Sequence, residues 1–415
     1  MFFHKFKKIL IFKKIKINSF IKNFLNKNFF FLEKKNTIFI CNYNVCIFLE
    51  NLFKFNKYTI ITNNINIYLK KKIYNNNKTF RFLFSFFNFI NFNFFQKNIK
   101  KYKNEKYFFF LPKNIIFLKN KNKHIYIFSI IKKKNNFVSF SKFLNLIIIK
   151  IKNYILINFI VKNYKNLNFF IKKKFFFKNI CKIQKNINIG NLTQCVISNM
   201  LYLKNFNIKR IINLNFYNFF FNYKKILILT HSPEFLIRKE YNENYTKPIA
   251  GTTDKNFEFI KILKNKKEIS EHLMLLDLSL NDTFKNNIKK IILKKMFFCE
   301  INKSLIHIVS EIFFSCYKKN NFEIIKKLFP AGTLSGSPKN DCIKLINILE
   351  KKNRFFYGGI FYYINKNHLE SCIMIRIKIF YKNNVLIESG SGIIDKSINY
   401  LEWLETIIKK QSFLK

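Results

Sequence analysis

Apolar and polar residues follow two different patterns along the chain. Up to about residue 165, short runs rich in Phe, Ile and Tyr alternate with Asn-Lys clusters, which predicts strands at 36–48, 58–68 and 124–131. The C-terminal half combines predicted strands with predicted helices. The strands there are 226–230, 357–364, 373–381 and 385–388, and the helices are 267–278, 338–350 and 400–410. Short polar turns at 365–367 and 383–384 predict antiparallel hairpins, so the expected fold class is α+β, with sheets packed against helices.

The composition is strongly basic and aromatic. The 415 residues include 56 Phe, 76 Lys plus Arg and only 22 Asp plus Glu, which gives a formal net charge of +54. Such a charge alone would favour a nucleic-acid or anionic-membrane partner. However, Lys is scattered with Asn and Phe along the whole chain, and residues with GC-rich codons are scarce. Codon bias in an AT-rich genome explains this pattern, so we expect no specific nucleic-acid partner.

Membrane and redox signals point to a cytoplasmic protein. No charge-free run of eighteen or more apolar residues occurs, so we expect no membrane partner and no membrane span. The eight Cys residues stand at irregular positions without paired CxxC spacing, which favours neither a zinc site nor a disulfide framework. A reducing, cytoplasmic localisation fits these features.

Acidic residues and glycines are concentrated in the second half of the chain. Only Glu33, Glu50 and Glu105 precede His231, and the other nineteen of the 22 acidic residues follow it. Gly190 is the single glycine before residue 251. In a chain biased toward Lys and Asn, carboxylates and glycines remain where they are needed. We therefore expect the chemistry in about the last 185 residues.

Two predicted helices each carry paired carboxylates on one face. Residues at i, i+3 and i+4, or i, i+3 and i+7, share a helix face. One such helix taken alone is more often a solvated amphipathic face than a site. Two of them in an acid-poor chain instead indicate a Mg²⁺ site, because Mg²⁺ prefers a few carboxylates together with an anionic substrate group. The predicted ligands are Glu268, Glu271, Glu402 and Glu405, with His272 and Lys409 beside the metal.

Four Gly-containing segments indicate anion binding. Glycine allows backbone N–H groups to approach an anion closely. Ser337 and Pro338 are predicted as the N-cap and first residue of a helix. With Arg376 on a strand, these loops suggest a cavity for a small substrate that has more than one carboxylate. The segments are Pro248-Ile-Ala-Gly-Thr252, Pro330-Ala-Gly-Thr-Leu-Ser-Gly-Ser-Pro-Lys339, Tyr357-Gly-Gly359 and Ser389-Gly-Ser-Gly392.

The order and spacing of these motifs resemble the chorismate-utilising enzymes. The resemblance covers the last half of the chain and is highly specific as a set. It implies antiparallel β-sheets in a sandwich-like core with helices packed outside. It also implies a divergent, eroded regulatory region at 1–165 and a chorismate-binding catalytic domain at 166–415. The matching segments include Gly190-Asn-Leu-Thr-Gln194, His231-Ser-Pro-Glu234, Glu271-His-Leu-Met-Leu-Leu-Asp277, His307-Ile-Val-Ser-Glu311 and the four Gly-containing segments.

Two positions separate the activities within this family. Ala250 stands where the aminodeoxychorismate synthases use a nucleophilic Lys, and Gln194 stands where the isochorismate and salicylate synthases use a Lys that activates water. The chain therefore resembles the anthranilate synthase branch, which adds ammonia directly. The alternatives are an aminodeoxychorismate or isochorismate/salicylate synthase relative, or a non-catalytic, polyanion-binding remnant of the family.

The resemblance implies a role for each candidate site residue. Glu234 would protonate the departing ring hydroxyl, and His307 would act in pyruvate elimination. Gln194 and Thr252 complete the catalytic set, and Gly251 lines the ring site with Thr252. The substrate carboxylates would be held by Tyr357, Arg376, Gly390, Gly392 and Lys409, and the cofactor Mg²⁺ by Glu271 and Glu405 with Glu268 and Glu402 nearby.

The resemblance also implies a partner, and the chain departs from the family at several positions. No Cys lies in a Gly-rich nucleophile elbow, so a separate glutamine amidotransferase subunit would supply the ammonia. The product, anthranilate, would enter tryptophan biosynthesis. Two arginines that are usual in the family are replaced here, one by Leu280 and the other by Thr253. Changes at Asn51 and 213–218, in the part that resembles the tryptophan-inhibition pocket, predict weak or lost inhibition by tryptophan.

Overall fold

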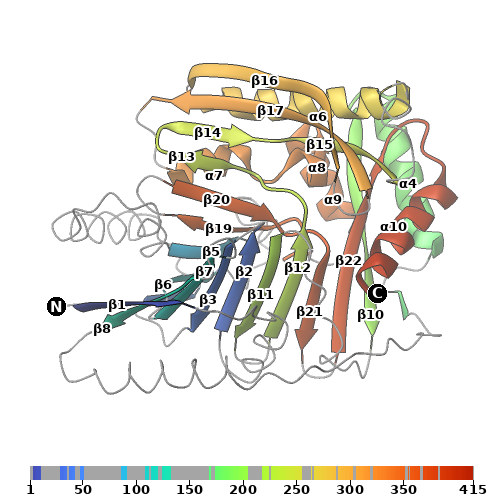
Figure 1. The fold of residues 1–415 in the computed structure, drawn as a ribbon. Coiled ribbons are helices and arrows are strands. Elements are labelled where there is room, and N and C mark those ends of the chain that lie inside the picture. The colour runs from blue at the N-terminus through green and yellow to red at the C-terminus, as the bar shows by residue number, and fades with distance from the viewer. Residues whose placement is uncertain are drawn as a thin grey trace.

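The described part of the chain forms two antiparallel sheets with helices around them (Figure 1). The computed structural model describes residues 3–10, 29–34, 37–42, 47–50, 86–90, 108–111, 114–119, 124–131, 168–169, 173–203, 217–223, 226–254, 263, 266–286, 288–301, 305–317, 321–350, 354, 356–364, 368–381 and 384–414. The predicted strand at 58–68 and the departures at Asn51 and 213–216 lie outside these residues. Within them, no helix is long and apolar enough to cross a membrane.

The first sheet, sheet A, has twelve strands among the described residues. It contains the strand that carries the segment Ser389-Gly-Ser-Gly392. In spatial order its strands are β1 (Phe3–Leu10), β8 (His124–Ile131), β7 (Asn114–Lys119), β3 (Thr37–Asn42), β2 (Phe29–Lys34), β11 (Tyr217–Tyr223), β12 (Ile226–Ser232), β21 (Ile377–Tyr381), β22 (Asn384–Ile393), β10 (Gln194–Leu203) and β18 (Gly336–Ser337), with β9 (Asn168–Phe169) on β10.

The second sheet, sheet B, has ten described strands and lies above sheet A in Figure 1. Its strands run across those of sheet A in this view. In order they are β15 (Ile249–Asp254), β17 (Leu305–Cys316), β14 (Glu243–Thr246), β13 (Arg238–Glu240), β20 (His368–Ile373), β19 (Ile360–Ile364), β5 (Phe86–Ile90), β6 (Phe108–Leu111) and β4 (Ile47–Glu50), with β16 (Ile288–Ile301) on β17.

Helices lie at one end of the two sheets, and beside and below the upper strands of sheet B (Figure 1). Helices α4 (Lys173–Asn188) and α10 (Asn399–Leu414), far apart in sequence, lie side by side next to β22 and β10. One continuous apolar core includes side chains from both sheets and these helices, such as Phe176, Ile228, Phe314 and Trp403. The described helices are α4 (Lys173–Asn188), α6 (Lys266–Phe284), α7 (Asn321–Leu328), α8 (Gly332–Ser335), α9 (Lys339–Leu349) and α10 (Asn399–Leu414). The predicted α+β class with antiparallel sheets is confirmed.

Strands from the N-terminal region belong to the same two sheets as the rest. β2 pairs with β11 in sheet A, and β5 pairs with β19 in sheet B. The predicted boundary at residue 165 therefore does not separate two independent sheets. Its division into a regulatory and a catalytic part stays a prediction.

Several local predictions are wrong. The predicted strand 373–381 is interrupted, because β20 lies in sheet B and β21 in sheet A. Arg376 therefore lies in the bend between the sheets, with a left-handed φ of 52°, and not on a strand. The predicted strand 357–364 begins only at Ile360, because a turn precedes it, closed by a hydrogen bond from the Gly359 N–H to the Phe356 carbonyl. Ser337 is not an N-cap because its backbone pairs with Gln194; Pro338 takes that position.

Candidate active site

Glu234 lies in the segment that leads from β12 in sheet A to β13 in sheet B. Its side chain is buried, and the Thr333 hydroxyl donates a hydrogen bond to Glu234 Oε1 at 3.0 Å. The Glu234 backbone is held by Ser232, whose hydroxyl donates to the Glu234 carbonyl at 2.9 Å. Burial raises the pKa of Glu234 to about 7, although the Thr333 hydrogen bond acts to lower it. A carboxyl group in this range holds a proton near neutral pH and can donate it.

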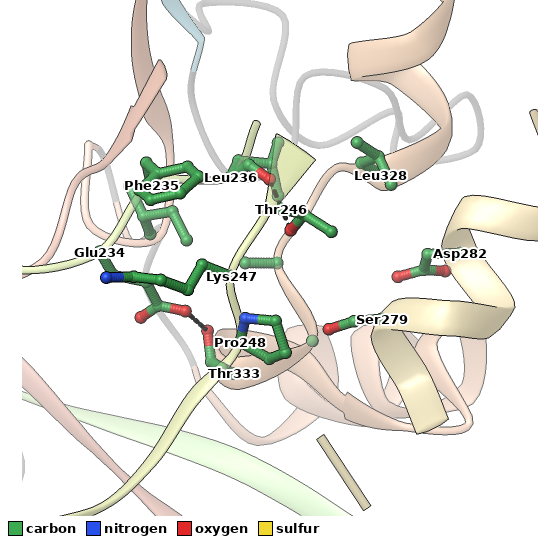
Figure 2. Close-up of a pocket in the computed structure, with 13 residues that line it drawn as sticks. Glu234, Phe235, Leu236, Thr246, Lys247, Pro248, Ser279, Asp282, Leu328 and Thr333 are labelled. Carbon is green, nitrogen blue, oxygen red and sulfur yellow. Dashed lines mark hydrogen bonds between the residues drawn. The ribbon is translucent and has the colours of Figure 1, made fainter. Parts of the chain in front are cut away.

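A small polar pocket adjoins Glu234 (Figure 2). Its volume is about 30 Å³. Glu234 and Lys247 lie on one side of it, and Ser279 and Asp282 of α6 lie on the other. Lys247 forms an ion pair with Glu300 of β16, and Asp282 forms a buried ion pair with Lys339 of α9. The pocket is therefore bounded by charges that are mostly compensated, with the Glu234 carboxyl reaching it directly.

Strands β10 and β22 form a second wall of the candidate site. Gly392 leaves room for the Gln194 side chain, because a Cβ at Gly392 would lie 2.4 Å from Gln194 Nε2. Gly390 likewise leaves room for Tyr357, whose hydroxyl would lie 2.7 Å from a Cβ there. The structure thus brings together four predicted residues, Gln194, Tyr357, Gly390 and Gly392, and shows why two of them are glycines.

Helix α10 places two predicted metal ligands, Glu402 and Glu405, beside Ser391 of β22. The Ser391 hydroxyl contacts Glu402 Oε2 and lies 2.9 Å from Glu405 Oε2. Lys409 forms an ion pair with Glu405 and donates to the Gly390 carbonyl at 3.0 Å. Burial raises the pKa of Glu402 above its usual range. Burial has the same tendency at Glu405, but the ion pair with Lys409 holds the pKa of Glu405 below its usual value.

The Glu402–Glu405 pair fits part of a Mg²⁺ site. Two carboxylates that share one hydroxyl group form an oxygen-only donor set, which suits a hard divalent cation. The other two predicted ligands, Glu268 and Glu271, lie half-buried on α6. Over the described ranges, no three His, Cys, Asp or Glu side chains are grouped so that they would hold a metal ion. The four-carboxylate site therefore stays a prediction.

His272 lies in a different environment from the one predicted for it. Its side chain is fully buried between α6 and β17, where Nε2 lies 2.7 Å from the Ser310 hydroxyl. Its ring also meets the Phe297 ring edge-on. Burial lowers the pKa of His272 to about 4, so the imidazole is neutral. We assign His272 to the packing of the helix on the sheet.

The remaining predicted residues lie on adjacent parts of the two sheets. His307 is buried on β17, and its backbone is paired with that of Thr252 on β15. A register shift between Ala250 and Thr252 marks the position of Gly251. Arg376 lies at the crossover from β20 to β21, just after Ile373, whose N–H donates to the Glu234 carbonyl at 3.1 Å. Burial lowers the pKa of Arg376 from its usual value.

Sequence comparison decides the family. The model of the chorismate binding enzymes matches residues 46–415. The chain belongs to the chorismate binding enzyme family. Two relatives of this chain are each named anthranilate synthase component 1. That of Acetivibrio thermocellus is 32% identical over 262 residues, 59% of this chain and 53% of the relative. That of Aquifex aeolicus is 30% identical over 259 residues, 58% of this chain and 52% of the relative. The chain thus spans about half the length of these relatives, and the predicted family resemblance is confirmed.

Solved structures support the chorismate-binding fold. The menaquinone-specific isochorismate synthase MenF from Escherichia coli has a TM-score of 0.80 at 14% identity, covering 100% of this chain and 95% of that chain. Anthranilate synthase component I from Streptococcus pneumoniae has a TM-score of 0.71 at 19% identity, covering 99% of this chain and 92% of that chain. At these identities the likeness concerns the fold alone.

Three residues that support the candidate site were not predicted from the sequence. Thr333 bonds Glu234, Ser391 links the two α10 carboxylates, and Arg354 bonds two segments of the site. Thr333 and Ser391 lie within two of the Gly-containing segments, and this position was the sequence signal that could have identified them. Arg354 stands between two motifs, and no local pattern marks it.

Proposed function

We propose that this chain is the large subunit of an anthranilate synthase. It would convert chorismate and ammonia to anthranilate and pyruvate, as a lyase in the first step of tryptophan biosynthesis. The observation that carries this proposal is the neutral Gln194 side chain packed against Gly392. A glutamine amide has no basic nitrogen and cannot activate water as the lysine of isochorismate synthases would. The relatives named anthranilate synthase component 1 support the same choice.

In the proposed reaction, Glu234 is the general acid. Its buried carboxyl, with a pKa of about 7, would hold a proton near neutral pH and pass it to the ring hydroxyl, which then leaves as water while ammonia adds to the ring. Thr333 would keep the carboxyl in one orientation through its 3.0 Å hydrogen bond. His307 on β17 would act afterwards, when pyruvate is eliminated and the ring becomes aromatic. Thr252 and Gly251 would line the ring site beside it.

The two substrate carboxylates would bind along β22, near Gly390 and Gly392. Tyr357, Arg376 and the backbone around Gly390 and Gly392 would bind the enolpyruvyl carboxylate. Lys409 would assist the ring carboxylate, since its ammonium group already lies 3.0 Å from the Gly390 carbonyl. Positively charged side chains at these places suit a dianionic substrate.

The proposed cofactor is Mg²⁺. Glu405 and Glu271 would hold it, with Glu402 and Glu268 nearby. When bound, the ion would neutralise the ring carboxylate of chorismate. The Ser391 hydroxyl would keep the α10 carboxylates close together in its absence.

We further propose a glutamine amidotransferase subunit as the partner that supplies ammonia. The relatives are named component 1, which supports a second component. Chain and partner would be tested together with glutamine, and the chain alone with ammonium. Production of anthranilate with ammonium, and its increase with glutamine only when the partner is added, is the expected result. Isochorismate or aminodeoxychorismate as the product would contradict the proposal.

A further inference from the structure

The guanidinium group of Arg354 is buried and makes four hydrogen bonds. Its Nε and Nη2 donate to the two carboxylate oxygens of Glu350, at 2.7 and 2.6 Å. Its Nη1 donates to the Leu334 carbonyl at 2.7 Å, and Nη2 also donates to the Val196 carbonyl at 2.7 Å. Arg354 is 2% exposed and Glu350 is 5% exposed. One side chain therefore links the segment 350–354 to α8 and to the distant strand β10.

Both carbonyl groups belong to segments that carry residues of the candidate site. Leu334 directly follows Thr333 in α8, and the Thr333 hydroxyl holds Glu234. Val196 lies on β10, two residues after Gln194. A shift of either carbonyl would therefore move a side chain that the proposed reaction uses.

Glu350 fixes the other end of this arrangement. Its Oε1 accepts a hydrogen bond from the Ser198 backbone N–H at 2.6 Å, so the ion pair is tied to β10 a second time. The Tyr357 N–H donates to the Arg354 carbonyl at 2.8 Å, which connects the pair to the turn that carries Tyr357. The ion pair thus contacts the three sides of the site that hold Gln194, Thr333 and Tyr357.

We propose that Arg354 is a positioning residue. It holds the Leu334 carbonyl, and so keeps the neighbouring Thr333 hydroxyl on Glu234, and it holds the Val196 carbonyl of β10, the strand that carries Gln194. It lies outside the residues that line the pocket at Glu234, so it acts through the backbone and not on the substrate. The inference rests on the proposed function, because Glu234 is the acid of that reaction. It adds that the acid is oriented by an ion pair whose members stand far from it in sequence.

The geometry requires a guanidinium group. Arginine presents five N–H donors in a rigid plane, whereas lysine presents three donors around a single nitrogen. A lysine at 354 would keep the positive charge beside Glu350 but would not reach both carbonyls and both carboxylate oxygens together. Arg354→Lys therefore separates the role of the charge from the role of the geometry.

The experiment compares Arg354→Lys with Thr333→Val and with the matched control Lys344→Met. Lys344 lies on α9 with its side chain 75% exposed and pairs only with Asp341 in the described contacts. The protonation of Glu234 is followed by infrared titration of its carboxyl band, identified by its loss in Glu234→Gln. Turnover of chorismate with ammonium is followed across pH in parallel.

We expect Arg354→Lys to move the Glu234 titration to higher pH, in the same direction as Thr333→Val, because loss of the Thr333 bond favours the protonated acid. We also expect kcat to fall by about tenfold to a hundredfold, with KM less affected. Lys344→Met leaves both unchanged. A Glu234 titration that moves in Thr333→Val but stays in place in Arg354→Lys would overturn the inference and leave the proposed function intact.

Two further outcomes are distinguishable. If Arg354→Lys does not fold, Glu350→Gln replaces it, because it keeps the side-chain shape and the bond to the Ser198 N–H; the same titration shift is expected. If the wild type turns over no chorismate, the proposed function fails, yet the infrared titration still decides whether Arg354 sets the environment of Glu234.

Discussion

Replacing Glu234 by Gln should make the protein less active and, at alkaline pH, more stable. The glutamine amide keeps the shape of the carboxyl and can still accept the Thr333 hydrogen bond, but it has no acidic proton that it could transfer to the substrate. Loss of a general acid lowers turnover by about 10²- to 10⁴-fold. The activity that remains should no longer fall as pH rises through about 7, where the pKa of the Glu234 carboxyl lies.

The stability effect follows from the same raised pKa. Burial raises the pKa of Glu234 from 4.5 to about 7, so the folded state binds this proton more tightly than the unfolded state does. Wild-type stability therefore falls as pH rises from about 4.5 to about 7, and does not change further through this group above that range. A difference of this size corresponds to about 3 kcal/mol. The Gln variant has no such loss.

Urea unfolding of the wild type and the Gln variant at pH 4 and at pH 8 measures this difference, since most other titrating groups cancel between the two proteins. We expect the variant to gain about 3 kcal/mol relative to the wild type between these two pH values. A stability difference that stays constant with pH would refute the reasoning, because the Glu234 carboxyl would then ionise equally in both states.

Three further substitutions test other contacts of the site. Thr333→Val removes a hydrogen bond to the carboxylate form of Glu234, so the alkaline limb of kcat/KM should move up by about one pH unit; a limb that stays in place contradicts this. Gly392→Ala places a Cβ 2.4 Å from Gln194 Nε2, which should displace that side chain and lower kcat by about tenfold or more; unchanged kinetics with an intact fold would show that the contact has no role. Lys409→Met should raise KM for chorismate about tenfold, measured from initial rates, and an unchanged KM would remove Lys409 from substrate binding.

Local patterns predicted the fold class and most element centres. The strand at His124–Ile131 follows directly from an Ile- and Phe-rich run, and the hairpin of β21 and β22 follows from the polar turn between them. Helix α6 continues to Phe284, beyond its predicted end at residue 278. Ser279 and Thr283 lie in this extension, and their hydroxyls donate to carbonyls one turn earlier. The prediction ends at residue 278 because the polar residues that follow give no apolar periodicity.

Long-range contacts could not be predicted from the sequence. Thr333 and Glu234 are 99 positions apart, and Arg354 and Val196 are 158 positions apart, so no local spacing relates them. The bend at Arg376 depends on which sheet each neighbouring strand joins. Candidate residues were predicted through motifs, whereas their orientation depends on contacts that only the folded chain makes.

The most direct test of the account is the product formed from chorismate. Purified protein is incubated with chorismate, Mg²⁺ and ammonium at mildly alkaline pH, and anthranilate is followed by its fluorescence. We expect anthranilate to accumulate, and to be lost with EDTA or in Glu405→Gln. A different chorismate-derived product, or no turnover by folded protein with the glutamine amidotransferase added, would contradict the account.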